Sequence, residues 1–124
     1  MDKKTDNLAG KTLRKRREEL GYSQTKMSRV AGISETFVSE IELGKKIPAD
    51  EKFIYRIADG YQLESEYVFR LFNKVPTVVA GEISEHKNLA DTLFSISNDK
   101  KLTAEQKEGL YEAFRQLYAD TVGE

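Results

Sequence analysis

The chain has 124 residues, of which 33% are charged and 39% hydrophobic, and it contains no cysteine. No apolar run reaches the ~20 residues that a membrane span needs, and the basic start lacks the apolar stretch of a signal peptide. The lack of cysteine excludes disulfides and thiolate metal sites. These features predict a cytoplasmic protein with no membrane partner.

Charge is unevenly distributed along the chain. Residues 1–74 hold fifteen Lys and Arg against twelve Asp and Glu, whereas residues 75–124 hold five against nine. Lys3 and Lys4 form a basic arm in the polar first six residues. The basic surplus indicates a polyanionic partner for the N-terminal part, although a solvated surface of mixed charge would give a similar count.

A helix is expected over residues 8–20, with Leu13 and Leu20 on its buried side. Arg17 lies between them on the same side, and a buried guanidinium needs an anionic partner. Glu42 flanks the buried side of a later helix, so we predict a structural ion pair between Arg17 and Glu42. Two unrelated surface charges are the alternative.

Residues 24–43 divide into two short amphipathic helices separated by Gly32. Ser23 and Ser34 stand where an N-cap would begin each helix, and Gly44 follows the second helix as a C-terminal stop. Two helices this short cannot bury themselves alone, so they require a scaffold. The apolar positions that would face it are Met27, Ala31, Ile33, Val38 and Ile41.

Two further helices complete a compact bundle of five. The first is expected over residues 50–59, ended by Gly60, and the second over residues 65–73. Residues 74–87 contain a Val-Val-Ala-Gly stretch, which favours neither helix nor strand strongly. We therefore interpret residues 1–73 as one domain and residues 74–87 as a linker with a possible short helix.

Residues 88–124 have the pattern of a helical hairpin. One helix is expected from about Leu89 to Ile96, and Thr103 with Gln106 has the spacing of a capping box for a long final helix. The hairpin would leave apolar surface uncovered, so it must pack against the bundle or join two copies of the chain, and we expect a homodimer. The final helix would present Leu110, Ala113, Phe114, Leu117 and Tyr118.

Residues 8–73 resemble the Cro/repressor-type helix-turn-helix domain of the XRE family. The resemblance rests on the stretches LRKRREELGYSQ, AGISETFVSEIELGKKIP and RIADGYQL, which follow one another in the expected order. The family implies an all-α, five-helix domain whose third helix, here Ser34 to Leu43, enters the major groove of double-stranded DNA. It also implies a dimer that reads two half-sites about one helical turn apart.

The resemblance places an unusual set of side chains on the DNA-reading face. A glutamate can accept a hydrogen bond from cytosine N4, and Phe37 or the Thr36 methyl can lie against a thymine methyl. We interpret Phe37 as facing outward because Val38 and Ile41 define the inward direction. The alternative for Glu35 and Glu40 is that they are solvated surface residues without a base contact. The expected base contacts are Ser34, Glu35, Thr36, Phe37 and Glu40.

The resemblance also implies phosphate contacts on both sides of this helix, and the acidic reading face makes that flanking positive charge necessary for affinity. For Lys45 and Lys46, the alternative is that they only form a solvated loop. Leu43 stands where the family often has a polar or basic residue. The basic cluster Arg14, Lys15 and Arg16 is either a further phosphate contact or a solvated face. The expected phosphate contacts are Ser23, Gln24, Ser39, Lys45 and Lys46.

Motifs of catalysis are absent from the sequence, which has no P-loop, no G-x-S-x-G and no cluster of metal ligands. The single histidine, His86, has Glu82 and Glu85 nearby, and we interpret it as an exposed side chain rather than a general base or metal ligand. We therefore expect no enzyme activity, no catalytic residue, no metal and no cofactor.

The sequence thus predicts a sequence-specific DNA-binding regulator of transcription, acting as a dimeric repressor on a palindromic operator. The alternative is a protein-interaction module of the antitoxin or anti-repressor type, which would dock through the acidic face of the third helix. A protein or small-molecule effector of the C-terminal hairpin is a third possibility, and no residue identifies such an effector.

Overall fold

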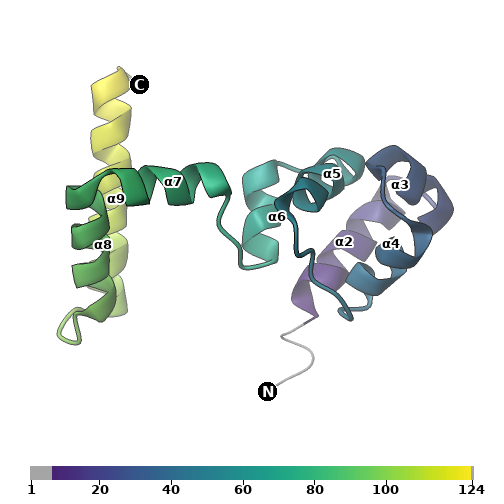
Figure 1. Cartoon of the computed structure of the whole chain (residues 1–124), viewed down its shortest axis with the longest axis horizontal. Coiled ribbons are helices and arrows are strands. Elements are labelled where there is room, and N and C mark those ends of the chain that lie inside the picture. The colour runs from purple at the N-terminus through teal and green to yellow at the C-terminus, as the bar shows by residue number, and fades with distance from the viewer. Residues whose placement is uncertain (1–6, 124) are drawn as a thin grey trace. The chain divides into compact units, whose positions relative to one another are not determined.

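The computed structural model describes residues 7–123, so the basic arm expected at Lys3 and Lys4 lies outside the described residues. Within this range the regular structure consists of helices without strands (Figure 1), which confirms the all-α prediction. None of these helices is long and apolar enough to cross a membrane. The helices are α2 (Leu8–Glu19), α3 (Gln24–Ala31), α4 (Glu35–Glu42), α5 (Glu51–Tyr61), α6 (Ser65–Leu71), α7 (Thr77–Glu85), α8 (Lys87–Asn98) and α9 (Ala104–Val122).

The chain divides into two compact units, Met1–Ala80 and Gly81–Glu124. The division falls within α7, in the segment that we expected to be a linker with a possible short helix.

The first unit is built around one apolar core to which α2, α3, α4, α5 and α6 all contribute. Full burial of a large aliphatic or aromatic side chain stabilises a fold by about 1.5–3 kcal/mol, so this shared core supplies what the short helices lack individually. The large side chains with the least exposure are Leu13, Met27, Val38, Ile41, Pro48, Ile54, Ile57, Tyr61, Val68 and Phe69.

The end of α5 differs from the sequence prediction. Gly60 does not end the helix, which continues to Tyr61 and stops where Gln62 takes a left-handed conformation with φ of 55°. A Cβ on Gly60 would lie 2.5 Å from the Cβ of Ala31 and 2.8 Å from its Cα. Gly60 is therefore explained by the close approach of α5 to α3, a tertiary contact that local helix-stop rules do not register.

Replacement of this glycine provides a test of the close contact. In an open helix, Gly→Ala gains up to about 1 kcal/mol, but in Gly60→Ala the new methyl would collide with α3. We expect Gly60→Ala to lower the free energy of unfolding by about 1–3 kcal/mol in urea titrations. Gly109→Ala is the matched control, because a Cβ there meets nothing within 4 Å, and it is expected to be neutral or stabilising.

The helix expected over residues 65–73 also ends early, at Leu71. Asn73 adopts a positive φ of 55°, and the next amide, that of Lys74, donates to the Phe69 carbonyl at 2.9 Å. Asn tolerates the left-handed conformation better than most residues, so it serves as a stop signal here.

The second unit contains α8 and α9, joined by residues 99–103. The capping box is present as predicted: the Gln106 amide donates to the Thr103 Oγ1 at 3.0 Å, and the Thr103 amide donates to the Gln106 Oε1 at 2.9 Å. No side chain described in α8 or α9 is buried, and large apolar groups such as Phe94, Phe114 and Leu117 stay open to solvent. This unit therefore has an apolar surface without a core.

Candidate nucleic-acid interface

The pair formed by α3 and α4 begins and turns at three specific residues. The Lys26 amide donates to the Ser23 Oγ at 3.0 Å, and the Phe37 amide donates to the Ser34 Oγ at 3.0 Å, so a serine caps each helix. Between the helices Gly32 has φ of 69°, a left-handed conformation that glycine adopts without strain. Caps and turn together fix where α4 starts.

The inward faces of the two helices leave the beginning of α4 uncovered. Met27 and Ala31 of α3 are buried, as are Val38 and Ile41 of α4. The residues that begin α4 lie outside this core and are open to solvent. The exposed residues at this end are Ser34, Glu35 and Thr36.

Glu35 is bonded to the preceding helix. The Thr25 hydroxyl donates to its Oε1 at 2.6 Å, and Thr25 lies in the first turn of α3. The bond joins the N-terminal turns of α3 and α4, where backbone amides have no partner within their own helix. Sequence reasoning did not identify Thr25, because its contact with Glu35 spans the turn between two helices.

The interpretation of Phe37 as an outward side chain is wrong in part. Phe37 is only partly exposed, packs against the core and places its ring 5.6 Å from that of Phe53 on α5. Phe37 precedes Ile41 by four residues, so the two share a face, and Phe37 stands at the edge of the buried stripe. Only part of its ring remains available to a partner.

The C-terminal end of α4 is closed by a Schellman motif. The Lys45 amide donates to the Glu40 carbonyl at 2.8 Å, the Gly44 amide donates to the Ile41 carbonyl at 3.2 Å, and Gly44 has φ of 77°. This turn folds the chain back over the helix end. The ammonium of Lys46 lies 3.5 Å from the Glu40 Oε1, and both Lys45 and Lys46 are exposed.

Arg17 and Glu42 form an ion pair inside the domain. The Arg17 Nε donates to both carboxylate oxygens at 3.1 and 2.9 Å, and its Nη2 donates to Oε1 at 2.9 Å. The Tyr61 hydroxyl donates to Oε2 at 2.7 Å, and the Arg17 Nη1 donates to the Tyr22 carbonyl at 3.0 Å. The network ties α2, α4 and α5 together at the end of α4.

The electrostatics of this network follow from its burial and its hydrogen bonds. The hydrogen bond to Glu42 raises the pKa of Arg17 against the opposing effect of burial. Burial, followed by the hydrogen bond to Glu42, raises the pKa of Tyr61 well above its usual value. Tyr61 is therefore held as a neutral donor and Arg17 as a cation, the two states that a carboxylate between them requires.

The helix-turn-helix family matches residues 13–68, from α2 into α6, a stretch that contains the α3–α4 pair. Residues 13–68 form an XRE-type helix-turn-helix domain. A comparison with curated proteins found no match. The chain thus carries a domain that DNA-binding regulators of transcription use.

The expected contact residues all lie in one segment of the helix-turn-helix domain, from the start of α3 to the loop after α4. Ser23, Ser34, Glu35, Thr36, Lys45 and Lys46 are exposed, whereas Gln24, Phe37, Ser39 and Glu40 are half-buried. Their contacts with bases and phosphates stay predictions.

Two arginines of the basic cluster on α2 have partners within the domain. Arg16 donates from Nε to the Tyr61 carbonyl at 3.0 Å and from Nη2 to the Gln62 carbonyl at 3.2 Å, so it caps the end of α5. Arg14 lies 3.7 Å from Glu18. Arg16 therefore has a structural role, which differs from both earlier interpretations of the cluster, a phosphate contact and a solvated face.

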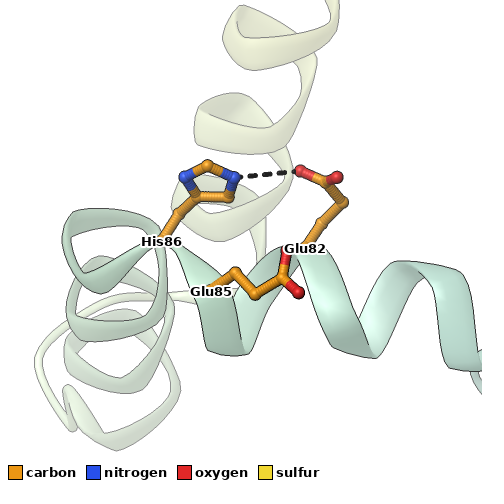
Figure 2. Close-up of side chains that lie close together, drawn as sticks. All are labelled: Glu82, Glu85 and His86. Atoms are coloured by element: carbon orange, nitrogen blue, oxygen red, sulfur yellow. Dashed lines mark ion pairs between the residues drawn. The ribbon is translucent and has the colours of Figure 1, made fainter.

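The histidine outside the helix-turn-helix domain lies in a small acidic cluster at the end of α7 (Figure 2). The Glu82 Oε2 is 3.3 Å from the His86 Nε2, and one ligand atom from each of Glu82, Glu85 and His86 lies within 4.8 Å of the others. All three side chains are exposed. Neighbours at helical spacing on a solvated surface form such groups without any ligand, so we assign no metal-binding or catalytic role to this cluster.

Proposed function

We propose that this protein recognises a specific DNA sequence by inserting α4 into the major groove, and that it represses transcription by occupying a palindromic operator as a dimer. The observation that carries the proposal is the arrangement of α4. Its first turn is exposed at Ser34, Glu35 and Thr36, while its last turn is fixed to α2 and α5 through Glu42. A helix presented in this way is the usual reading element of a helix-turn-helix domain.

Base recognition in this proposal uses acceptors and apolar groups. Glu35 and Glu40 accept hydrogen bonds from cytosine N4, and the Thr36 methyl and the open part of the Phe37 ring lie against thymine methyls. Ser34 adds a hydroxyl that donates or accepts. Such a surface favours particular base pairs, because acidic side chains gain nothing from the phosphates.

Affinity in this proposal comes from the residues that flank the reading face. Ser23 and Gln24 lie at the N-terminal end of α3, where free backbone amides and the helix dipole favour a phosphate. Ser39 adds a hydroxyl. Lys45 and Lys46 supply positive charge in the loop after α4, where each phosphate contact releases a counterion from the DNA.

The division between base and phosphate contacts is tested with Thr36→Ala and Lys45→Ala. Lys45→Ala is expected to weaken binding to every sequence and to reduce the slope of log K against log salt by about 0.9. Thr36→Ala is expected to change preference at one base pair, by about 1 kcal/mol, at an unchanged salt slope. Selection from random duplex DNA gives the preference, and anisotropy titrations give the slope.

Lys100→Ala, which removes a charge between α8 and α9, is the control and should leave both quantities unchanged. Equal losses for Thr36→Ala and Lys45→Ala on every sequence would contradict the assigned roles. Wild-type binding that does not fall between ~50 and ~200 mM salt would contradict the DNA-binding proposal itself and favour docking of α4 on a protein.

A further inference from the structure

In the proposed complex, two anions compete for the ammonium group of Lys46: the Glu40 carboxylate and a DNA phosphate. We propose that Glu40 holds Lys46 in the free protein and releases it to phosphate on binding, so that Glu40 selects against DNA that leaves its carboxylate without a donor. This inference rests on the proposed function, and it adds a penalty for wrong sequences to the attractive contacts assigned above.

The geometry keeps the two side chains together. The ammonium of Lys46 is 3.5 Å from the Glu40 Oε1, and the Lys45 and Lys46 amides donate to the Glu40 carbonyl at 2.8 and 3.4 Å. The backbone therefore anchors Lys46 to the same residue that its side chain pairs with. Glu40 is 27% exposed and Lys46 58%, so the lysine is the partner that can swing outward.

The energetic consequence depends on the DNA sequence. If Lys46 stays paired, it contributes little to the attraction of phosphates, because its charge is already compensated. If Lys46 leaves, the Glu40 carboxylate faces the phosphates alone, unless a base offers it an exocyclic amine such as cytosine N4. DNA sequences without that amine therefore bind less favourably, because the Glu40 carboxylate is left without a donor near the phosphates. At a base pair that supplies the amine, this unfavourable contribution to the binding free energy disappears.

Glu35 offers a matched comparison on the same helix. Its carboxylate accepts a hydrogen bond from the neutral Thr25 hydroxyl, not from a cation. Neutralising Glu35 removes the same amount of negative charge as neutralising Glu40, but it frees no lysine. The two substitutions separate the release of Lys46 from the general effect of charge.

The test measures binding of the full chain to mixed-sequence duplex DNA by anisotropy at several salt concentrations. Glu40→Gln is expected to bind this DNA about two- to five-fold more tightly, the range for an exposed ion pair, with a salt slope steeper by up to about 0.9. Glu35→Gln is expected to leave the slope unchanged. On the DNA selected by the wild type, Glu40→Gln should gain less, so the ratio of specific to non-specific affinity falls.

A double-mutant cycle with Lys46→Gln decides the cause. In the Lys46→Gln background, Glu40→Gln should no longer steepen the salt slope, because no lysine remains to be released. Equal effects of Glu40→Gln in both backgrounds would overturn the inference while leaving the proposed function intact. A wild type without salt-dependent DNA binding would overturn both. Thermal unfolding by circular dichroism should confirm that each variant is folded.

Discussion

A chain carrying Glu42→Gln is expected to lose about 3–5 kcal/mol of its free energy of unfolding, the usual effect of breaking a buried ion pair. Glu42 accepts from both Arg17 and Tyr61, and its side chain is only 2% exposed. Glutamine keeps the shape of glutamate but loses the charge, so the guanidinium is left uncompensated in the interior. A domain whose total stability is about 5–15 kcal/mol would then be close to unfolding at ordinary temperatures.

The measurement is urea unfolding of the full chain by circular dichroism. A matched variant replaces the whole network with apolar groups, as Arg17→Met, Glu42→Leu and Tyr61→Phe together. The triple variant is expected to restore most of the lost stability, because no buried charge is left without its counterion and only the Tyr22 carbonyl loses a donor. A loss below about 1 kcal/mol in Glu42→Gln would show that water compensates Arg17 and would contradict this account.

The same network bears on function, because Glu42 is the last residue of α4. A carboxylate at the C-terminal end of a helix is unfavourable for the helix dipole, and Arg17 compensates for it from α2. The presence of Glu42 at this position is therefore explained by its contacts with α2 and α5, which attach α4 to the rest of the domain, and not by the stability of α4 itself. We expect Glu42→Gln to weaken DNA binding on every sequence without altering base preference.

Local chemistry made much of the fold predictable. Ser23, Ser34 and Thr103 were recognisable as caps from their positions before apolar runs, and the structure has a cap at each. The pairing of Arg17 with Glu42 was predictable for a different reason. A cation on a buried helix face has few possible partners in so short a domain.

Contacts between helices set the limit of prediction. Gly60 was expected to stop α5 because glycine often does so, whereas its role depends on the Ala31 backbone, far away in sequence. Phe37 was expected to face outward, but its ring packs against that of Phe53 on α5. The pairing of Glu40 with Lys46 depends on the path of the loop after α4. Periodicity within one helix contains no information on any of these neighbours.

The apolar surface of the second unit leads to the other large expected effect. Phe114 is 62% and Leu117 63% exposed, and together with Leu110 they follow one face of α9 at helical spacing. We propose that a second copy of the chain covers this face. Burial of each such side chain contributes at least about 1.5 kcal/mol, and in a symmetric dimer each residue is buried twice. The double substitution Phe114→Glu with Leu117→Glu is therefore expected to remove at least about 6 kcal/mol of association free energy, which raises the dissociation constant roughly 10⁴-fold.

Sedimentation is expected to show a dimer for the wild type and a monomer for Phe114→Glu with Leu117→Glu, while the fold of the helix-turn-helix domain is retained. Because a monomer engages one half-site at a time, affinity for a palindromic operator should fall by about 10²-fold or more, and affinity for an isolated half-site should stay constant. Gln116→Glu is the control, since it adds charge to a polar position of α9, and it should leave the dimer intact. A wild type that sediments as a monomer at the concentrations at which it binds DNA would refute the dimer, and the exposed face of α9 would then require a different protein to cover it.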